Sequence, residues 1–422
     1  MNNVSGSVSG GAPGGMEEPM IAPVPRISIQ AFCESTDIAA IIQEAISDRR
    51  MDKAHVKVHM GGAPGAVEAY RNAPTPNVIV LEQAGDRSAL MESLDALAEF
   101  CDAGTKVIVC GKLNDILFYR ALIARGVSEY LVAPFGVLEF IRAISHLYAS
   151  PGAVPVGRTI AVVGAKGGVG ASTIAHNLAW EIARGFEIAT VIVDFDLGFG
   201  TAGLDFNQDP PQGLADAVFA PDRLDANLVD RLLSKCSNNL SMLAAPATLD
   251  RIYDLSETTF DAVIDLLRVS VPCIVYDLPH VWTAWARRLL VGADDVVVVA
   301  TPDLANLRNA KNILDTMRGA RPNDSRPKLV LNGIGVLKRP EISTADFAKA
   351  VEIEPSIVIP YDAKLFGTAA NNGQMIGEVE ASSKTAELLR ELAQIVTGRV
   401  ETKKAKRSLF PPLMSKLGRK KA

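Results

Sequence analysis

The chain has 422 residues, of which 48% are hydrophobic and 22% are charged, and its formal net charge is −5. The length predicts two domains, and the composition is typical of a globular protein. The negative net charge argues against a protein whose whole surface binds nucleic acid. No run approaches the roughly 18 to 20 apolar residues that span a bilayer, and the N-terminus lacks the pattern of a signal peptide, so we expect a cytoplasmic protein.

The five cysteines are scattered, without a C-x-x-C pair or a nearby histidine cluster. Free cysteine is among the most buried residue types, so we expect each to be a small buried hydrophobe. We predict neither disulfides nor a cysteine metal site. The residues are Cys33, Cys101, Cys110, Cys236 and Cys273.

Two segments rich in Gly, Ser and Pro divide the chain. Residues 1–25 lack apolar periodicity, which predicts a disordered arm. The second segment, SPGAVPVG, separates two patterned regions and predicts a linker at 150–157. We therefore expect domains at 26–149 and 158–397, followed by a basic tail at 398–422.

In the first domain, short β-branched runs alternate with amphipathic stretches, as in RISIQAF, DIAAIIQEAISD and VKVHM. Such alternation predicts βαβ units and a parallel sheet. The length suits a flavodoxin-like α/β fold with about five strands and five helices.

The stretches TPNVIVLEQ, KVIVCGK and GVSEYLVAPF resemble the receiver domain of two-component response regulators. The resemblance implies a phosphorylated aspartate where this chain has Glu82, and a lysine where it has Ala133. No acidic pair follows the strand in ISIQAFCES to hold magnesium. A degenerate receiver that serves interaction or dimerisation is the favoured interpretation, and an unrelated α/β domain is the alternative.

The second domain opens with RTIAVVGAKGGVGAST, an apolar strand that runs into glycines and then into a helix. Ile174, Leu178 and Ile182 share one face of that helix before Gly185 ends it. Continuous Val/Ile runs such as ATVIVDFD and DDVVVVATPD predict a mainly parallel sheet covered on both faces. The sequence therefore predicts a doubly wound P-loop NTPase domain.

The glycine-rich stretch predicts a phosphate-binding loop, in which backbone N–H groups and a helix N-terminus face the anion. Gly167, Gly168 and Gly170 allow the close approach, and the Ser172 hydroxyl takes the position that usually ligates Mg²⁺. Ala171 stands where the loop lysine belongs.

KGGVGAST resembles the deviant phosphate loop of the ParA/MinD superfamily, K-G-G-x-G-K-[ST]-[ST]. The resemblance implies that Lys166 reaches the phosphates of a dimer partner, that Asp194 lies near the magnesium and that Asp196 orients the attacking water. It also implies that Asp277 is the Walker B carboxylate and that Asn332 contacts adenine.

Plainer roles remain open for several of these residues. An aspartate at a strand end is often a cap or turn residue, and asparagine before glycine is often a turn. His280 is expected to pack or cap, with a switch role as the alternative, because DLPHVW lacks the family's usual glycine.

The predicted site has three sets of residues. The nucleotide-binding set is Lys166, Gly167, Gly168, Val169, Gly170, Ala171, Ser172, Thr173 and Asn332. The metal ligands are Ser172, Asp194 and Asp277, and the catalytic residues are Asp196 and Lys166.

The missing loop lysine sets the expected chemistry. A lysine about 4 Å from a phosphate oxygen is worth roughly 4 kcal/mol at an effective dielectric of 20, before its desolvation cost. We therefore expect binding of ATP and Mg²⁺ that is tied to dimerisation, with slow or absent hydrolysis.

The C-terminal stretch KKAKRSLFPPLMSKLGRKKA places apolar residues between two basic clusters. Such segments attract anionic lipid at roughly 1 kcal/mol per Lys or Arg. Pro411 and Pro412 argue against one continuous helix, so we expect an extended contact with a membrane surface or an acidic partner. A solvated disordered tail is the alternative.

A degenerate receiver joined to such an ATPase resembles the CpaE/TadZ family of Flp/Tad (type IVb) pilus assembly proteins. The resemblance implies a cytoplasmic homodimer, placed at the inner-membrane surface and the cell pole. Its partners would be the traffic ATPase and the inner-membrane assembly components. A DNA-partitioning ATPase and a nucleotide-free scaffold remain as alternatives, and the acidic balance argues against DNA.

Overall fold

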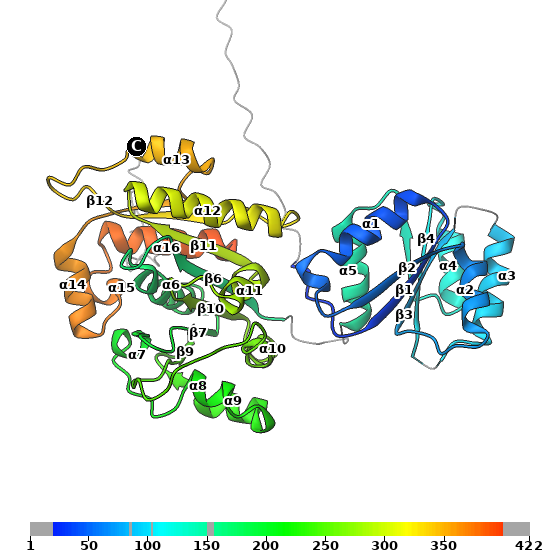
Figure 1. Ribbon diagram of the computed structural model, residues 1–422, viewed down its shortest axis with the longest axis horizontal. Helices are drawn as coiled ribbons and strands as arrows, with labels where there is room; N and C mark the ends of the chain where they lie inside the picture. The colour runs from blue at the N-terminus through cyan, green and yellow to red at the C-terminus, as the bar shows by residue number, and fades with distance from the viewer. Residues whose placement is uncertain (1–19, 84–86, 103, 150–155, 400–422) are drawn as a thin grey trace, which may run out of the picture.

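The computed structural model describes residues 20–83, 87–102, 104–149 and 156–399. The chain forms two α/β lobes, each built on its own sheet (Figure 1). The predicted arm up to residue 19, most of the predicted linker and the basic tail from residue 400 lie outside the described residues.

The last part of the predicted arm, residues 20–25, differs from our expectation of disorder. Ile21 and Val24 are buried in the core of the first lobe. The Val24 N–H also donates to the carbonyl of Arg50 at 2.8 Å. The chain is therefore packed from Ile21 onward, because two apolar side chains in an otherwise polar arm find a place in that core.

The first lobe has a parallel sheet with the strand order β2-β1-β3-β4-β5. Its strands are β1 (Ser28–Cys33), β2 (His55–Met60), β3 (Val78–Gln83), β4 (Lys106–Gly111) and β5 (Glu129–Val132). This order confirms the flavodoxin-like α/β fold.

Helices cover both faces of this sheet (Figure 1). They are α1 (Thr36–Ile46), the 3₁₀ turn η1 (Arg49–Met51), α2 (Gly62–Tyr70), α3 (Arg87–Ala98), α4 (Ile116–Ala124) and α5 (Val137–Tyr148). Helices α1 and α5 pack on one face, and α2, α3 and α4 pack on the other. The apolar pattern did not predict a range for α2, because its GAPGAVEAY sequence carries Gly and Pro.

The second lobe has a larger sheet with the strand order β13-β12-β11-β6-β10-β7-β9-β8. Its strands are β6 (Arg158–Gly164), β7 (Thr190–Asp194), β8 (Ser234–Lys235), β9 (Leu240–Leu243), β10 (Cys273–Leu278), β11 (Asp295–Ala300), β12 (Lys328–Ile334) and β13 (Ile357–Pro360). Neighbouring strands run parallel except at the edge, where the short β8 pairs antiparallel with β9. The predicted doubly wound, mainly parallel sheet is confirmed.

Side chains of the central strand β6 alternate between two cores. Ala161 and Val163 face α8 (Leu214–Val218), α9 (Ala226–Leu232), α10 (Asp261–Ser270), α11 (Ala284–Gly292), α12 (Leu304–Ala320) and α13 (Thr344–Val351). Ile160 and Val162 face α6 (Ala171–Gly185), α14 (Ala363–Asn372), α15 (Ile376–Val379) and α16 (Lys384–Thr397). The loop after β6 therefore lies at the carboxyl edge of a sheet that is covered on both sides.

Two further findings concern expectations from composition. In the described part of the chain, helices are too short or too polar to cross a bilayer. All five cysteines are free; Cys33, Cys110 and Cys273 are buried, whereas Cys101 and Cys236 are only partly buried.

Candidate functional site

The loop between β6 and α6 has the conformation of an anion cradle. Gly168 and Gly170 have φ angles of 79° and 85°, in the left-handed region that favours glycine. A Cβ atom on Gly167 or Gly168 would face open space. The loop thus presents backbone, rather than side chains, above the N-terminus of α6.

His280 and Asn309 hold the start of this loop from one side. The His280 Nδ1–H donates to the carbonyl of Gly164 at 3.0 Å, and the Asn309 amide donates to the carbonyl of Ala165 at 2.8 Å. His280 therefore caps the end of β6, as expected for its plainer role.

Asn332, at the end of β12, holds the loop from the other side. Its amide Nδ2 donates to the Val169 carbonyl at 2.8 Å, and its buried Oδ1 has no hydrogen-bond partner. A Cβ on Gly170 would lie 2.6 Å from the same Nδ2. Asn332 thus holds the glycine loop in place, and its predicted contact with adenine stays a prediction.

Lys166 is exposed at the loop, whereas Ala171 and Ser172 are half-buried at the first turn of α6. Burial alone would raise the pKa of the nearby Asp303 carboxyl. Hydrogen bonds from Asn306 and Thr301, together with the Lys166 charge, lower that pKa instead. The positive charge of Lys166 therefore lies on the solvent-exposed side of the loop, not in its interior.

The two predicted strand-end carboxylates lie side by side, because Asp194 on β7 pairs in register with Asp277 on β10. Burial, reinforced by the Asp277 charge, raises the pKa of Asp194 to about 7. Both Asp194 oxygens accept backbone N–H groups, from Asp196 and from Ala202, each at 3.1 Å. Asp194 thus organises the loop that follows β7.

Asp196 lies in that same loop and is half-buried. Its Oδ1 accepts the N–H of Phe199 at 3.0 Å, and its carbonyl accepts the N–H of Gly200 at 2.7 Å. The structure therefore places Asp196 next to Asp194, with its carboxylate engaged in its own turn. A catalytic role for Asp196 stays a prediction.

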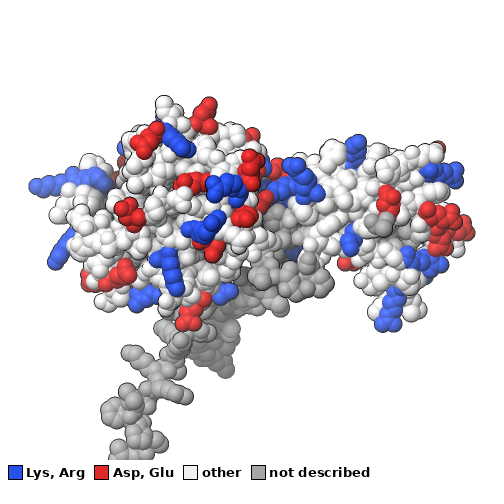
Figure 2. Space-filling view, turned by 90° about the horizontal axis from the view of Figure 1, so that it is seen from below, with Lys and Arg blue, Asp and Glu red and all other residues white. Residues whose placement is uncertain are grey.

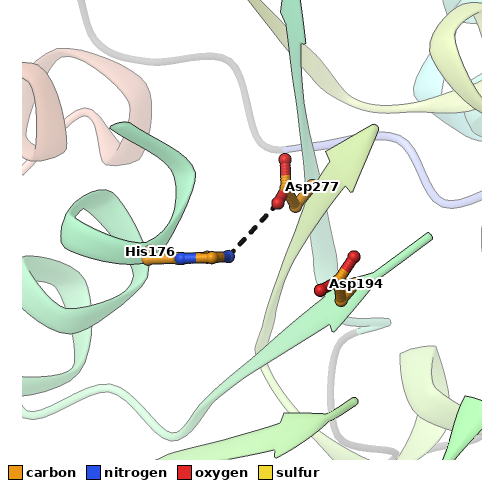
Figure 3. Close-up of side chains that lie close together, drawn as sticks. All are labelled: His176, Asp194 and Asp277. Carbon is orange, nitrogen blue, oxygen red and sulfur yellow. Dashed lines mark ion pairs between the residues drawn. The ribbon is translucent and has the colours of Figure 1, made fainter. Parts of the chain in front are cut away.

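His176 is a residue of the site that the sequence analysis missed. It lies one helical turn after Ser172 on α6 and is fully buried. Its Nδ1 is 2.7 Å from Asp205 Oδ2. Its Nε2 is 3.2 Å from Asp277 Oδ2, the ion pair drawn in Figure 3. Burial lowers its pKa, but the two carboxylates outweigh burial and raise it to about 10. A histidine four positions after the loop serine, on one helix face, was the available signal.

The donors present suit a divalent cation bound with a nucleotide. Asp277 Oδ1 is buried without a hydrogen-bond partner, so an oxygen ligand remains free at the end of β10. Ser172 lies in the first turn of α6, the helix that follows the neighbouring strand β6. Hard oxygen ligands of this kind are those that Mg²⁺ prefers.

In the first lobe, Glu82 on β3 is bonded through its carboxylate to the segment that begins α1. Its carboxylate accepts the backbone N–H groups of Glu34 and Ser35, each at 2.8 Å, and the Ser35 hydroxyl at 2.6 Å. Glu82 is buried, and Ser35 is the N-cap of α1. The carboxylate thus ties β3 to the start of α1.

No protein-family model matches the chain. It is 28% identical to the septum site-determining protein MinD of Helicobacter pylori over 279 residues, which covers 60% of this chain and 97% of that protein. The crystal structure of a ParA family ATPase from Chlorobium tepidum is 26% identical with a TM-score of 0.51, and the match covers 56% of this chain and 98% of that one. The crystal structure of the pilus assembly protein CpaE from Caulobacter crescentus is 47% identical over 31% of this chain and 100% of that chain, with a TM-score of 0.30.

Together, the glycine loop, the paired strand-end aspartates and the doubly wound sheet define the class of a P-loop protein. The second lobe is similar in sequence to MinD and in fold to a ParA family ATPase, which supports the ParA/MinD superfamily for it.

Proposed function

We propose that this chain is an ATP-binding, dimerising assembly factor for a Flp/Tad pilus machinery, with slow or absent ATP hydrolysis. The observation that carries the nucleotide part is the loop itself. Gly168 and Gly170 take left-handed backbone angles, and Lys166 is exposed beside a first helical turn that begins with Ala171.

Each residue of the site has a role in this proposal. The backbone from Gly167 to Gly170 binds the phosphates, and the N-terminus of α6 stabilises their charge. Ser172, Asp194 and Asp277 hold Mg²⁺, which neutralises phosphate charge when bound. Asp196 orients a water molecule.

The missing lysine accounts for slow turnover. Without a cation at position 171, the developing charge in phosphoryl transfer lacks a partner inside the same subunit. Lys166 is exposed and free to reach a second subunit. ATP binding and dimerisation are therefore favoured over fast ATP hydrolysis.

Large exposed apolar side chains on the second lobe fit a protein partner. Phe199 lies in the loop after β7, Trp282 follows β10 and Leu304 begins α12, and each is more than half exposed. These three residues follow β7, β10 and β11. Strands β10 and β11 are the two neighbours of β6, which leads into the glycine loop, and β7 lies next to β10. We propose that these three side chains are covered in the dimer, which buries apolar surface as stable interfaces do.

The pilus part of the proposal comes from the combination of a receiver-like lobe with such an ATPase. The proposed partners are the traffic ATPase and the inner-membrane components, with placement at the cell pole. The contact of the basic tail with a membrane or an acidic partner belongs to the proposal, although the tail lies outside the described residues.

A DNA-partitioning ATPase is the second candidate. On the face drawn in Figure 2, Lys and Arg are interspersed with Asp and Glu, without a dominant basic stripe. Such a surface suits a protein partner better than a polyphosphate backbone. ATP-dependent retention on nonspecific DNA that weakens steeply with salt would favour this candidate instead.

The test compares wild type with Lys166→Ala and Ala171→Lys by fluorescent ATP-analogue titration, sedimentation velocity and phosphate release. We expect wild type to bind and dimerise with little turnover, Lys166→Ala to lose ATP-dependent dimerisation, and Ala171→Lys to gain affinity. Lys349→Ala, an exposed lysine on α13, is the control. Wild type that binds no ATP would favour a nucleotide-free scaffold. Piliation and the position of a tagged Lys166→Ala protein then test the cellular role.

A further inference from the structure

A polar cluster lies beneath the phosphate loop, within the apolar second lobe. It consists of His176 on α6, Asp194 on β7 and Asp277 on β10, and all three are buried (Figure 3). One nitrogen and two carboxylate oxygens of these residues lie within 4.8 Å of one another. Three different elements thus bring metal-ligating atoms to one point.

Two atoms of the cluster are incompletely satisfied. His176 Nε2 is buried and meets only the ion-pair contact with Asp277 Oδ2 at 3.2 Å, and Asp277 Oδ1 is buried without a partner. A buried acceptor without a partner costs about 1–3 kcal/mol, so such atoms call for an explanation. A divalent cation that displaces the proton of His176 Nε2 to solvent would contact both atoms.

His176 is oriented as a metal ligand would be. Its Nδ1 is 2.7 Å from Asp205 Oδ2, which directs Nε2 toward the two other carboxylates. A ligating histidine usually donates its second ring N–H to a carboxylate in this way, which fixes the ring and raises its basicity.

We infer that His176, Asp194 and Asp277 form a binding site for a divalent transition ion, with Zn²⁺ as the best fit. Zn²⁺ takes imidazole nitrogen and carboxylate oxygen at about 2.0–2.2 Å, which places ligand atoms roughly 3.3 Å apart. The cluster reaches that spacing if its atoms approach by at most about 1.5 Å. Three protein ligands leave a fourth position open to water or a phosphate oxygen.

The site shares its two carboxylates with the proposed Mg²⁺ site, but His176 belongs to this site alone. Imidazole favours zinc-like ions, whereas Mg²⁺ prefers oxygen ligands and keeps its waters. The inference rests on the proposed function only through those shared carboxylates. Metal binding without nucleotide therefore tests it separately.

The experiment titrates untagged, chelator-treated full-length protein with Zn²⁺ against a chromophoric competitor, in the absence of nucleotide. We expect one ion per wild-type chain, at least 100-fold weaker binding in His176→Gln, and 10–100-fold weaker binding in Asp205→Asn. His146→Gln, an exposed histidine on α5, is the control. No stoichiometric binding by wild type, or equal losses in His146→Gln, would overturn the inference.

A measurement on wild type covers the case in which His176→Gln does not fold. The electron paramagnetic resonance spectrum of one equivalent of Cu²⁺ should show nitrogen hyperfine coupling, and its absence would also overturn the site. Mg²⁺–ATP binding is measured in parallel on the same proteins. A protein that binds ATP but no Zn²⁺ refutes only this inference, and one that binds Zn²⁺ but no ATP refutes only the proposed function.

Discussion

Arg49, in the 3₁₀ turn of the first lobe, donates to Asp294 of the second lobe through two guanidinium nitrogens, each at 3.2 Å. The same guanidinium donates to Asp324 at 2.9 and 3.1 Å. Less than a tenth of each of these side chains is exposed. Because Asp294 lies just before β11, the first lobe docks at the amino edge of the second sheet, away from the glycine loop.

Removal of the Arg49 side chain is expected to destabilise this contact strongly. Arg49→Ala removes one of several cations around two buried carboxylates, since Asp294 keeps Arg268 and Asp324 keeps Arg50 and Arg321. Breaking a buried pair outright costs about 3–5 kcal/mol, so we expect a loss at the lower end, about 3 kcal/mol. Urea unfolding should show a fall of that size, or an early transition as the lobes separate. Arg125→Ala is the control, since its pair with Asp95 is exposed and worth about 0–1 kcal/mol. Similar losses in the two variants would contradict this role of Arg49.

The same network predicts sensitivity to acid. Burial would raise the pKa of Asp324, but hydrogen bonds and charges from Arg49, Arg321 and Arg50 lower it to about 2. A depressed carboxyl pKa stabilises the folded state above the unfolded value of about 3.9, and this contribution is lost as pH falls toward 2. The loss amounts to about 2 kcal/mol. Urea unfolding between pH 5 and pH 2.5 should show a shallower fall for Asp324→Asn than for wild type, and equal slopes would contradict the assignment.

Local sequence patterns predicted much of the fold and the loop. Continuous β-branched runs predicted the buried parallel strands, and the spacing of Gly167, Gly168 and Gly170 predicted the glycine loop between β6 and α6, because both patterns depend on neighbouring residues alone. Asp194 and Asp277 could be placed together because carboxyl ends of parallel strands share one edge.

The contacts that sequence reasoning missed join residues far apart in the chain. Arg49 and Asp294 are 245 positions apart, and nothing local marks either of them as buried. In the sequence, His176 is only a polar residue within an apolar helix. Its partner Asp205 lies on α7 (Ala202–Asp205), which only the fold places next to it. Tertiary packing, rather than spacing, decides such pairs.

Shortening Glu82 is expected to destabilise the first lobe. Glu82→Asp retracts the carboxylate by one methylene, so it cannot keep all of its bonds to the N–H groups of Glu34 and Ser35 and to the Ser35 hydroxyl. Hydrogen bonds to a charged group are worth about 1.5–3 kcal/mol each, so we expect a loss of about 2 kcal/mol. Urea unfolding followed by tyrosine fluorescence or circular dichroism measures it. Glu92→Asp, at an exposed position on α3, is the control and should change stability by under about 0.5 kcal/mol. A loss of similar size in both variants would refute the role of Glu82.

Gly170 is expected to be the glycine of the phosphate loop that least tolerates a side chain. Its φ of 85° is costly for alanine, and the added Cβ would lie 2.6 Å from Asn332 Nδ2. If Asn332 moves aside, its bond to the Val169 carbonyl is lost. Gly170→Ala should therefore cost about 1–3 kcal/mol of unfolding free energy without nucleotide.

Gly167→Ala is the matched control for that variant, because its Cβ would face open space, and we expect a change under about 1 kcal/mol. The double variant Gly170→Ala with Asn332→Ala separates backbone strain from the steric clash. If the clash contributes, the double variant loses less stability than the sum of the single variants, by about 0.5 kcal/mol or more. If the losses of the single variants simply add in the double variant, the cost of Gly170→Ala comes from the backbone angle alone. If Gly167→Ala loses as much stability as Gly170→Ala, neither the left-handed angle nor Asn332 determines that cost.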